Sequence, residues 1–392
     1  MGGRVPGPES CCRAARSRRA WSRRNRGRSL PVSRRPIVHQ FTAVLAPRDA
    51  VGQHTLSVDS LLREMGAETQ IFAAHVHPEV KTRGCDFREH AASPRPDLVI
   101  YQASIGSPVG DHVLSLQTPL VLNYHNMTPA EFFDPWDPAV SAELDHGRRQ
   151  LARLAHRAEY AIADSQYNAD ELLDLGMEPH EVVVSPVLFS PLWESVGDGV
   201  SPVSPEGEQV TLLFVGRLSP NKCQQDLVGV LAGVRALGVD ARLVLVGGVS
   251  SSGFVDAVVG LAGELGVSDS LVVAGSVSEA ELVGWYEAAD VFVSASEHEG
   301  FCVPVVEALG FGLPVVAFGA AAVPETLGGA GLVFGEKSPG VVAEAVVRVV
   351  SDVGIREGLV ERGLVRAREL GLAASTERMR AVLQPLLDEA ST

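Results

Sequence analysis

Two cations in the middle of the chain have a spacing that could serve phosphate chemistry. Arg217 and Lys222 lie in the turn after an apolar run that ends at Gly216. Glycine lets the backbone approach a ligand closely, and two such cations can neutralise a diphosphate. A departing diphosphate gains negative charge, which fixed cations stabilise best in a dry cleft. An ordinary strand–turn–helix with solvated cations would explain this stretch equally well.

Two carboxylates accompany a predicted helix start after the apolar run Val291–Ser294. Pro304 suits the first turn of a short helix, whose N-terminus offers free N–H groups to an anion, most naturally a phosphate. Glu299 precedes this helix and Glu307 lies one turn inside it, and carboxylates suit the vicinal hydroxyls of a ribose or hexose. Alternatively, Glu299 is a helix N-terminal charge and Glu307 is solvated. Because Glu307 lies within an apolar run, where an unneeded carboxylate is costly, the functional interpretation is favoured.

The elements that must position these residues are predicted from short runs rich in Val, Ile and Leu. Such runs lack alternation, which predicts strands buried on both faces and therefore parallel sheets covered by helices. Two consecutive series predict an α/β fold with two doubly wound, Rossmann-like domains facing a cleft. The expected strands lie near Ile37–Leu45, Thr69–Ala73, Leu98–Tyr101, Leu120–Tyr124, Ala161–Ala163, Val182–Val187, Thr211–Val215, Leu243–Val246, Leu271–Ala274, Val291–Ser294, Val315–Phe318 and Leu332–Phe334.

Domain bounds follow from composition. Residues 36–195 and 205–370 form the two predicted domains, separated around Pro191–Gln209, where Gly, Pro, Ser and acidic residues cluster. The last segments, Val342–Leu370 and Ser375–Glu389, are predicted helices, and residues 371–392 form a C-terminal helical segment.

Charge is distributed unevenly along the chain. The formal net charge is −15, yet residues 1–35 contain eleven arginines and one acid, Glu9. The remainder is therefore strongly acidic, which argues against a nucleic-acid partner. The arginine-rich start is either an arm that touches anionic membrane or polyanions, or, as we favour, a disordered extension or a misassigned start.

Other sequence features favour a soluble, cytoplasmic protein. No apolar run approaches the roughly 18 residues needed to span a bilayer, and the start lacks the apolar stretch of a secretory signal. The five cysteines show no CxxC spacing, which fits a reducing compartment. No DxD motif follows a strand, so no metal site and no cofactor are predicted; His75 and His77 alternate as on an exposed strand end.

Together these motifs resemble the GT-B retaining glycosyltransferases of family 4. Gly216-Arg217-Leu218 with Lys222, then Glu299 and Glu307 about eighty residues later, carry the resemblance in the C-terminal half. Three further stretches match a bacterial subset of that family: Asp49-Ala50-Val51-Gly52, Tyr124-His125-Asn126-Met127-Thr128-Pro129 and Ala163-Asp164-Ser165-Gln166-Tyr167-Asn168. The resemblance spans residues 37–370.

This resemblance implies metal-independent transfer of a sugar, with retention of configuration, from a nucleotide-diphosphate sugar. The acceptor would be a sugar, a lipid-linked glycan or a small molecule, and peripheral contact with the inner membrane face stays open. The last helix would cross back onto the N-terminal domain. A sugar-nucleotide epimerase, a phosphorylase or a non-catalytic sugar-nucleotide-binding protein on the same fold is the alternative. A phosphorylase needs an added phosphate site, for which the sequence shows no further paired cations.

The resemblance also assigns roles by position. Arg217 and Lys222 would bind the donor diphosphate, Glu307 the ribose hydroxyls and Glu299 the hydroxyls of the transferred sugar. His125 would reach the donor sugar from the acceptor side. The remaining donor contacts would be Gly52 in a glycine loop, Gly216, and the backbone N–H groups of Phe301, Cys302 and Val303.

The sequence departs from the family at two cysteines. The family usually has glycine where this chain has Cys223 and Cys302. A side chain at Cys302 is expected to narrow the donor-sugar pocket. Two further residues are open: Glu325 is either a loop carboxylate or a ligand of the nucleotide, and Trp136 either lines an acceptor site or anchors a loop.

Overall fold

The computed structural model describes residues 34–47, 49–196 and 209–391. Nearly all of the arginine-rich start and most of the predicted boundary stretch Pro191–Gln209 therefore lie outside the described residues.

The N-terminal half contains a seven-stranded parallel sheet in the order β3-β2-β1-β4-β5-β6-β7. Its strands are β1 (Ile37–Leu45), β2 (Glu68–Val76), β3 (Gly84–Asp86), β4 (Leu98–Ala103), β5 (Leu120–Tyr124), β6 (Tyr160–Ala163) and β7 (Val182–Val184). The helices of this half are α1 (Ala50–Glu64), η2 (Pro78–Val80), η3 (Phe87–Ala92), α2 (Pro108–Ser115), η4 (Ala130–Phe132), α3 (Pro138–Arg157), α4 (Gln166–Asp174) and α5 (Leu192–Val196).

The C-terminal half repeats this plan with a six-stranded parallel sheet in the order β10-β9-β8-β11-β12-β13. Its strands are β8 (Val210–Val215), β9 (Ala241–Val246), β10 (Leu271–Gly275), β11 (Val291–Ser294), β12 (Val315–Phe318) and β13 (Leu332–Phe334). Its helices are η5 (Pro220–Lys222), α6 (Gln224–Ala236), α7 (Ser252–Glu264), η6 (Ser268–Ser270), α8 (Glu279–Ala288), α9 (Val303–Gly310), α10 (Val323–Leu327), α11 (Pro339–Ser351), α12 (Val353–Leu370) and α13 (Leu372–Ala390).

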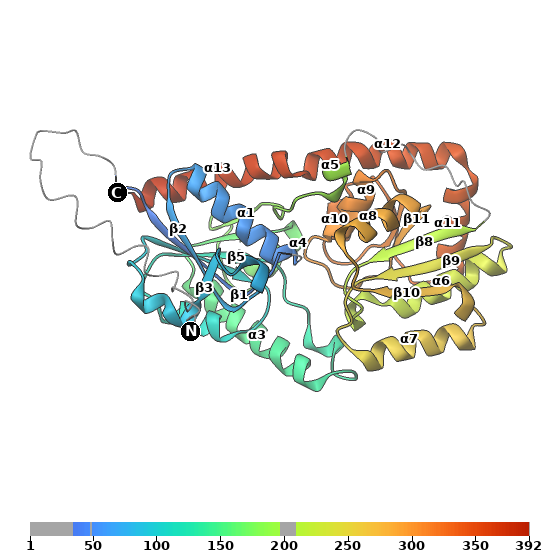
Figure 1. Ribbon diagram of the computed structural model, residues 1–392, viewed down its shortest axis with the longest axis horizontal. Helices are drawn as coiled ribbons and strands as arrows, with labels where there is room; N and C mark the ends of the chain where they lie inside the picture. Colours follow the sequence, from blue (N-terminus) through green and yellow to red (C-terminus); the bar gives the residue numbers. More distant parts are fainter. Residues whose placement is uncertain (1–33, 48, 197–208, 392) are drawn as a thin grey trace, which may run out of the picture.

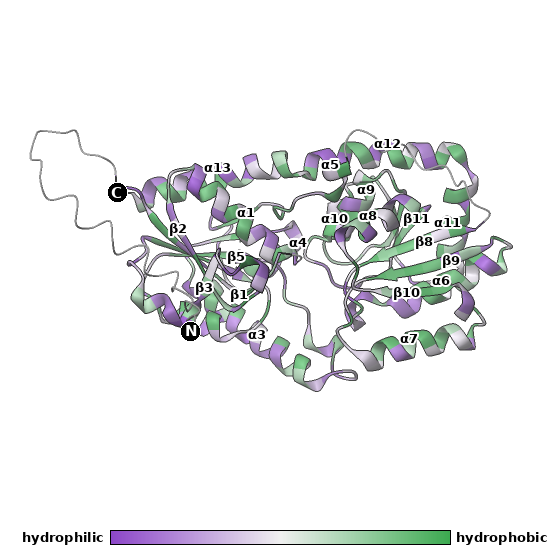
Figure 2. Cartoon of the chain, in the orientation of Figure 1, coloured by the Kyte–Doolittle hydropathy of each residue, from purple (hydrophilic) through white to green (hydrophobic). Residues whose placement is uncertain are grey.

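Each half has its own apolar core on both faces of its sheet. In β8, Leu212 and Phe214 pack into one cluster while Leu213 packs into another on the opposite face. This arrangement explains why the central strands lack polar alternation, and Figure 2 shows the strands of the C-terminal sheet in hydrophobic colours. The prediction of two doubly wound parallel α/β sheets is confirmed.

Helix starts are fixed by side-chain caps that the sequence supplies at the ends of strands. Asp49, Ser107 and Ser165 accept a backbone N–H at the starts of α1, α2 and α4. Ser278 and Glu281 form a reciprocal capping box on α8. These caps fix the loops between strand and helix, which are the loops that face the other half.

The C-terminal helices connect the two halves. Figure 1 shows α12 and α13 along one side of the molecule, beginning over the C-terminal half and ending over the N-terminal half. Met379, Leu383 and Leu387 of α13 are buried in a cluster with Val58 and Leu61 of α1. The last helix is thus part of the core of the N-terminal half.

Two element predictions were wrong in detail. The segment Val342–Leu370 was predicted as one helix, but Asp352 has an extended conformation and caps a new helix, α12. Strand β3 was missed because Gly84-Cys85-Asp86 has no apolar run. Among the described residues, no helix combines the length and apolar character needed to cross a membrane.

Candidate active site

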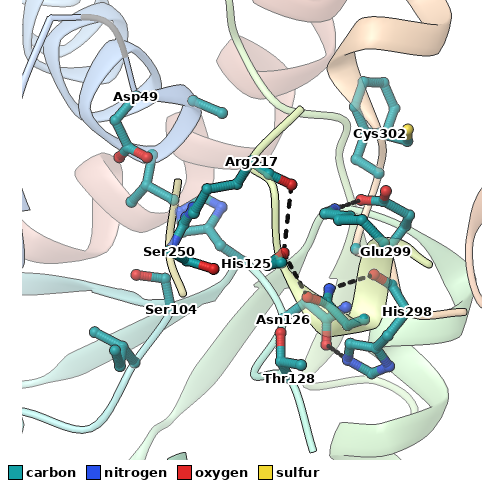
Figure 3. A pocket seen from close by; sticks show the side chains of 18 of the residues that line it. Asp49, Ser104, His125, Asn126, Thr128, Arg217, Ser250, His298, Glu299 and Cys302 are labelled. Atoms are coloured by element: carbon teal, nitrogen blue, oxygen red, sulfur yellow. Dashed lines mark hydrogen bonds and ion pairs between the residues drawn. The ribbon is translucent and has the colours of Figure 1, made fainter. Parts of the chain in front are cut away.

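A cavity of about 630 Å³ lies between the carboxyl ends of the two sheets. Loops of both halves line it, including the turns after β1, β4, β5, β8 and β11. Figure 3 shows Asp49, Ser104 and His125 of the N-terminal half on one side and Glu299, His298 and Cys302 on the other, with Arg217 between them.

The two predicted cations both line this cavity but have different partners. Lys222 Nζ lies 2.6 Å from Glu299 Oε2, and both side chains are largely buried. The guanidinium of Arg217 has no hydrogen bond or ion pair to another described residue, although Ser219 and Gln224 both donate to its backbone carbonyl. Arg217 is therefore available to an anion, whereas Lys222 is already neutralised by Glu299.

The turn after β8 is held against the loop after β11. Glu297 N donates to Asn221 O (2.9 Å), and Asn221 Nδ2 donates to His298 O (3.3 Å). Ser219 Oγ donates to Asn221 Oδ1 (2.8 Å). These hydrogen bonds hold the loop that carries Arg217 and Lys222 against the loop that carries Glu299.

Helix α9 begins at the cavity without a side-chain cap. Its N-cap residue is Cys302, whose side chain accepts no hydrogen bond from the helix, and Pro304 lies in the first turn. Cys302 and Val303 line the cavity, as does Phe301, which is also packed among Val187 and Val306. An uncapped helix start with N–H groups at a cavity suits an anionic ligand.

Cys223 and Cys302, where the resemblance led us to expect glycine, both have left-handed backbones. Cys302 has φ 71° and ψ 66°, and Cys223 has φ 52° and ψ 44°. Each is the N-cap of its helix, α9 or α6, and glycine adopts such angles without strain. Both loops therefore require the left-handed conformation that glycine adopts most easily, although the residue in each is a cysteine.

Glu307 lies behind the cavity and does not line it. Its side chain is buried and accepts a hydrogen bond of 2.8 Å from the hydroxyl of Tyr286. Burial raises the pKa of Glu307 to about 7, although the Tyr286 hydrogen bond lowers it in part. The carboxyl therefore titrates near neutral pH.

His125 belongs to a hydrogen-bonded ladder across four neighbouring strands. Its Nδ1 lies 2.9 Å from Asp164 Oδ2 after β6, and its Nε2 lies 2.7 Å from Gln102 Oε1 on β4. Gln102 Nε2 donates to Gln40 Oε1 on β1, and Gln40 Nε2 donates to Thr55 O, which fixes both amide orientations. Nε2 of His125 must then donate to Gln102, so both ring nitrogens are engaged within the N-terminal half.

Two predicted glycines stand apart from the cavity wall. Gly52 lies in the first turn of α1 rather than in a loop, and a Cβ there would lie 1.9 Å from Ala46 O. It therefore allows α1 to begin against the backbone of the preceding turn. Gly216 has φ 154° and precedes Arg217, and it too lies outside the cavity wall.

One direct contact between the halves joins two residues to which the sequence assigned no role. Asn126, with φ 75°, and His298 share a hydrogen bond of 2.7 Å across the cleft. Burial lowers the pKa of His298 to about 4, so it is neutral at pH 7. A clue existed in the sequence, since Asn tolerates the left-handed region after a strand, but the pairing needs the tertiary structure.

Glu325 lies in the short helix α10 and reaches the other half. Both of its carboxylate oxygens accept from Gln166 N at the start of α4, at 2.8 and 3.0 Å. Trp136 also bridges the halves, with its ring 5.2 Å from that of Phe254 on α7. Neither residue lines the main cavity.

Near the cavity, Cys223, Asp226 and Glu297 could together ligate a metal ion. The ammonium of Lys337 lies 2.7 Å from both Asp226 and Glu297. This lysine occupies the space between the two carboxylates and offsets part of their charge.

Comparisons with known proteins agree with this geometry. Residues 209–352 match the family described as glycosyl transferases group 1. A D-inositol 3-phosphate glycosyltransferase of Actinosynnema mirum is 32% identical over 243 residues, which is 58% of each chain. A GDP-mannose-dependent alpha-(1-6)-phosphatidylinositol monomannoside mannosyltransferase of Mycobacterium tuberculosis is 33% identical over 155 residues, 37% of this chain and 40% of that protein. The chain thus spans less than two thirds of these relatives' length.

Solved structures share the fold at low sequence identity. Sucrose-phosphate synthase from Thermosynechococcus elongatus superposes with a TM-score of 0.70 at 17% identity, covering 91% of this chain and all of that one. Anabaena HepE in complex with UDP and glucose superposes with a TM-score of 0.69 at 15% identity, covering 89% and 100%. The chain accordingly has the two-domain GT-B fold, and its residues 209–352 are similar to the glycosyl transferases group 1 family.

Proposed function

We propose that this protein is a glycosyltransferase that moves a sugar from a nucleoside-diphosphate donor to a hydroxyl of an acceptor, with retention of configuration and without a divalent metal. The observation that carries the proposal is Arg217, a cation without a carboxylate partner among the described residues, facing a cavity between two Rossmann-like halves. The uncapped start of α9 at the same cavity adds partial positive charge for the diphosphate.

In the proposed reaction, the bond between the anomeric carbon and the diphosphate oxygen breaks while the acceptor oxygen bonds to the same face of that carbon. The departing phosphate oxygen takes the acceptor proton, so atoms and charge balance. Arg217 would stabilise the charge that develops on the diphosphate, and closure of the halves would exclude water. Lys222 and Glu299 would act as a pair, with Glu299 accepting from sugar hydroxyls and Lys222 holding it in place.

Donor identity is a further part of the proposal. Among the similar proteins, HepE was solved with UDP-glucose and one mannosyltransferase is named for GDP-mannose. A uridine or guanosine diphosphate sugar is therefore the first class to test. Contact between Glu307 and the ribose hydroxyls would require the cavity wall at α9 to open, because Glu307 lies behind it.

The test measures binding and slow hydrolysis of UDP-, GDP-, ADP- and dTDP-sugars, with EDTA present. We expect one nucleotide to bind and release its sugar, and Arg217→Ala to lower kcat/KM on the order of 100-fold, as loss of one charge-stabilising group does. Arg235→Ala is the matched control, because Arg235 pairs with Asp240 on the surface of the same half. The anomeric configuration of the transferred sugar, read by NMR, tests retention.

The opposite results are equally clear. If no sugar nucleotide binds, or if Arg217→Ala behaves as the control does, the donor site is misassigned. Binding without turnover in any acceptor mixture would favour a non-catalytic sugar-nucleotide-binding protein. Interconversion of the sugar without its release would favour an epimerase.

A further inference from the structure

The cavity has two chemically different ends. Among the described residues, the Lys and Arg side chains that line it are Arg217 and Lys222, both from the C-terminal half. The end formed by the N-terminal half is lined by the loop after β4, the segment after η4 and the first turns of α3. If the donor diphosphate takes the cationic end, this other end is left for the acceptor.

An apolar wall covers much of the acceptor end. Val140 and Leu144 lie four positions apart, on one face of α3, and Ile105 and Phe133 join them from neighbouring loops. All four side chains line the cavity. Such a wall favours a ligand that brings an apolar group to it.

The described residues at this end carry negative charge. Asp49 caps Gly52 N at 3.0 Å, and Asp164 pairs with His125, so both of these carboxylates already have partners. Glu143 of α3 is exposed, lines the cavity and has no hydrogen bond or ion pair to another described residue. An unpaired carboxylate attracts hydroxyl or ammonium donors and repels an anion.

We infer that the acceptor enters the cavity as a hydroxyl-bearing molecule without a phosphate, uncharged or positively charged, with an apolar group against Ile105, Phe133, Val140 and Leu144. Glu143 sets this preference. The inference rests on the proposed function for the assignment of the two ends. It distinguishes the chain from the relatives that are named for inositol 3-phosphate.

The test compares matched probes by direct binding to the full chain, with inorganic pyrophosphate present to occupy Arg217, and by transfer from the donor found above. Hexyl glucoside should bind at least about 10-fold more tightly than methyl glucoside, because several methylene groups leave water at the apolar wall. Glucose should bind at least about 10-fold more tightly than glucose 6-phosphate, because Glu143 repels the phosphate.

Variants assign each preference to its residues. Glu143→Lys should abolish or reverse the penalty on glucose 6-phosphate, and Val140→Ser should reduce the preference for the hexyl group. Asp145→Lys is the matched control, since Asp145 is exposed on the same helix, pairs with Arg149 and does not line the cavity. It should keep both preferences. Arg48 lies outside the described residues, so Arg48→Ala is tested alongside and should also keep them.

Equal or tighter binding of the phosphorylated probe, the absence of a chain-length effect, or no binding of any probe would overturn the inference. Direct binding separates the two claims. A chain that binds a sugar nucleotide but prefers the phosphorylated probe contradicts this inference alone. A chain with the expected probe preferences but no affinity for any sugar nucleotide contradicts the proposed function instead.

Discussion

At the scale of single residues, Cys223 and Cys302 show that a loop can require a left-handed backbone at a position that is not glycine. Cys302 keeps the left-handed conformation that glycine would adopt freely, and it does so at the start of α9, where the cavity begins. The strained backbone at this position therefore comes from the fold of the loop and not from the residue type. Burial raises the pKa of the Cys302 thiol well above its usual range, so the thiol is uncharged at neutral pH.

This requirement predicts an unusual order of stabilities. Cys302→Gly should be more stable than Cys302→Ala by about 1 kcal/mol, because a Cβ in the left-handed region costs more than the extra chain entropy of glycine. Urea unfolding without ligand measures the difference. Cys85 lies in β3, where the order should reverse and Ala should be more stable than Gly. Greater stability of Cys302→Ala than of Cys302→Gly would contradict the strain argument.

Burial of the Glu307 carboxyl has a cost in stability. Its folded pKa is about 7, raised chiefly by burial from the usual 4.5. Between these values the unfolded chain ionises while the folded chain keeps its proton, so the free energy of unfolding falls as pH rises from 4.5 to 7. Above pH 7 the loss is complete, and below 4.5 it is absent.

Glu307→Gln should remove this loss while keeping an acceptor for the Tyr286 hydroxyl. We expect the free energy of unfolding at pH 8 to rise by up to about 3 kcal/mol, and that at pH 4 to stay the same. Denaturant unfolding at the two pH values is the measurement, with Glu344→Gln on the exposed face of α11 as control. An equal effect at pH 4 and pH 8 would show that ionisation of Glu307 is not the cause.

At the scale of elements, a chain of three histidines joins β1, η3 and α2. His90 Nε2 lies 3.1 Å from His39 Nδ1, and His90 Nδ1 lies 3.1 Å from His112 Nε2. The rings of Phe41 and Phe72 pack around them. Burial, with the neighbouring histidine charge as a smaller cause, lowers the pKa of His39 to about 3 and that of His90 to about 4.

This cluster should make the N-terminal half sensitive to mild acid. Because the folded pKa values lie below the usual 6.5, the stability is complete above pH 6.5 and is lost as pH falls from there. We expect the unfolding temperature to fall between pH 7 and pH 5, and His90→Gln to reduce that fall. His156→Gln, at an exposed site on α3, should leave it unchanged. A fall of equal size in His90→Gln would exclude the cluster as its source.

Strands with apolar runs could be predicted from the sequence almost to the residue. Ile37–Leu45 and Leu120–Tyr124 agree in full with β1 and β5, because central strands are buried on both faces. Edge strands carry less signal: β7 ends at Val184, three residues before the predicted end, and β3 was missed. The break at Asp352 was missed because both flanking segments are helical.

Within the site, the sequence could indicate which loops contribute but not how their residues pair. Arg217 and Glu299 follow strands, so their place at the carboxyl edge was predictable. The hydrogen bonding of both His125 ring nitrogens could not be predicted, because it depends on the orientations of two glutamine amides on neighbouring strands. The neutralisation of Lys222 by Glu299 likewise joins two loops that are far apart in the sequence.

For the whole molecule, contacts of several kinds hold the two halves around the cavity, among them the packing of Phe301 against Val187 and Phe189. Gly300 allows its loop to lie against Asn126 of the other half, since a Cβ at Gly300 would lie 2.7 Å from Asn126 Cβ. The hydrogen bond between Asn126 and His298 lies at this point. The contact between Gln166 and Glu325 joins the next strand–helix loop of each half. The polar contacts bury less surface than the core of either half. We therefore expect the two halves to move relative to one another, and these contacts to favour the closed arrangement.

Removing one contact should therefore favour a more open arrangement without unfolding either half. In Glu325→Ala the N-terminus of α4 loses its carboxylate partner, so the radius of gyration without ligand should increase and a nucleoside diphosphate should restore it. Donor affinity should weaken roughly threefold to tenfold, because closing the exposed interface costs more without a charged hydrogen bond. Small-angle scattering and calorimetry measure the two effects, with Glu361→Ala, at an exposed site on α12, as control. If Glu325→Ala matches the control in both measurements, this contact does not hold the halves together. The closed arrangement then rests on the other contacts described: the Asn126–His298 hydrogen bond, the Trp136–Phe254 ring contact, the packing of Phe301 against Val187, and helix α13.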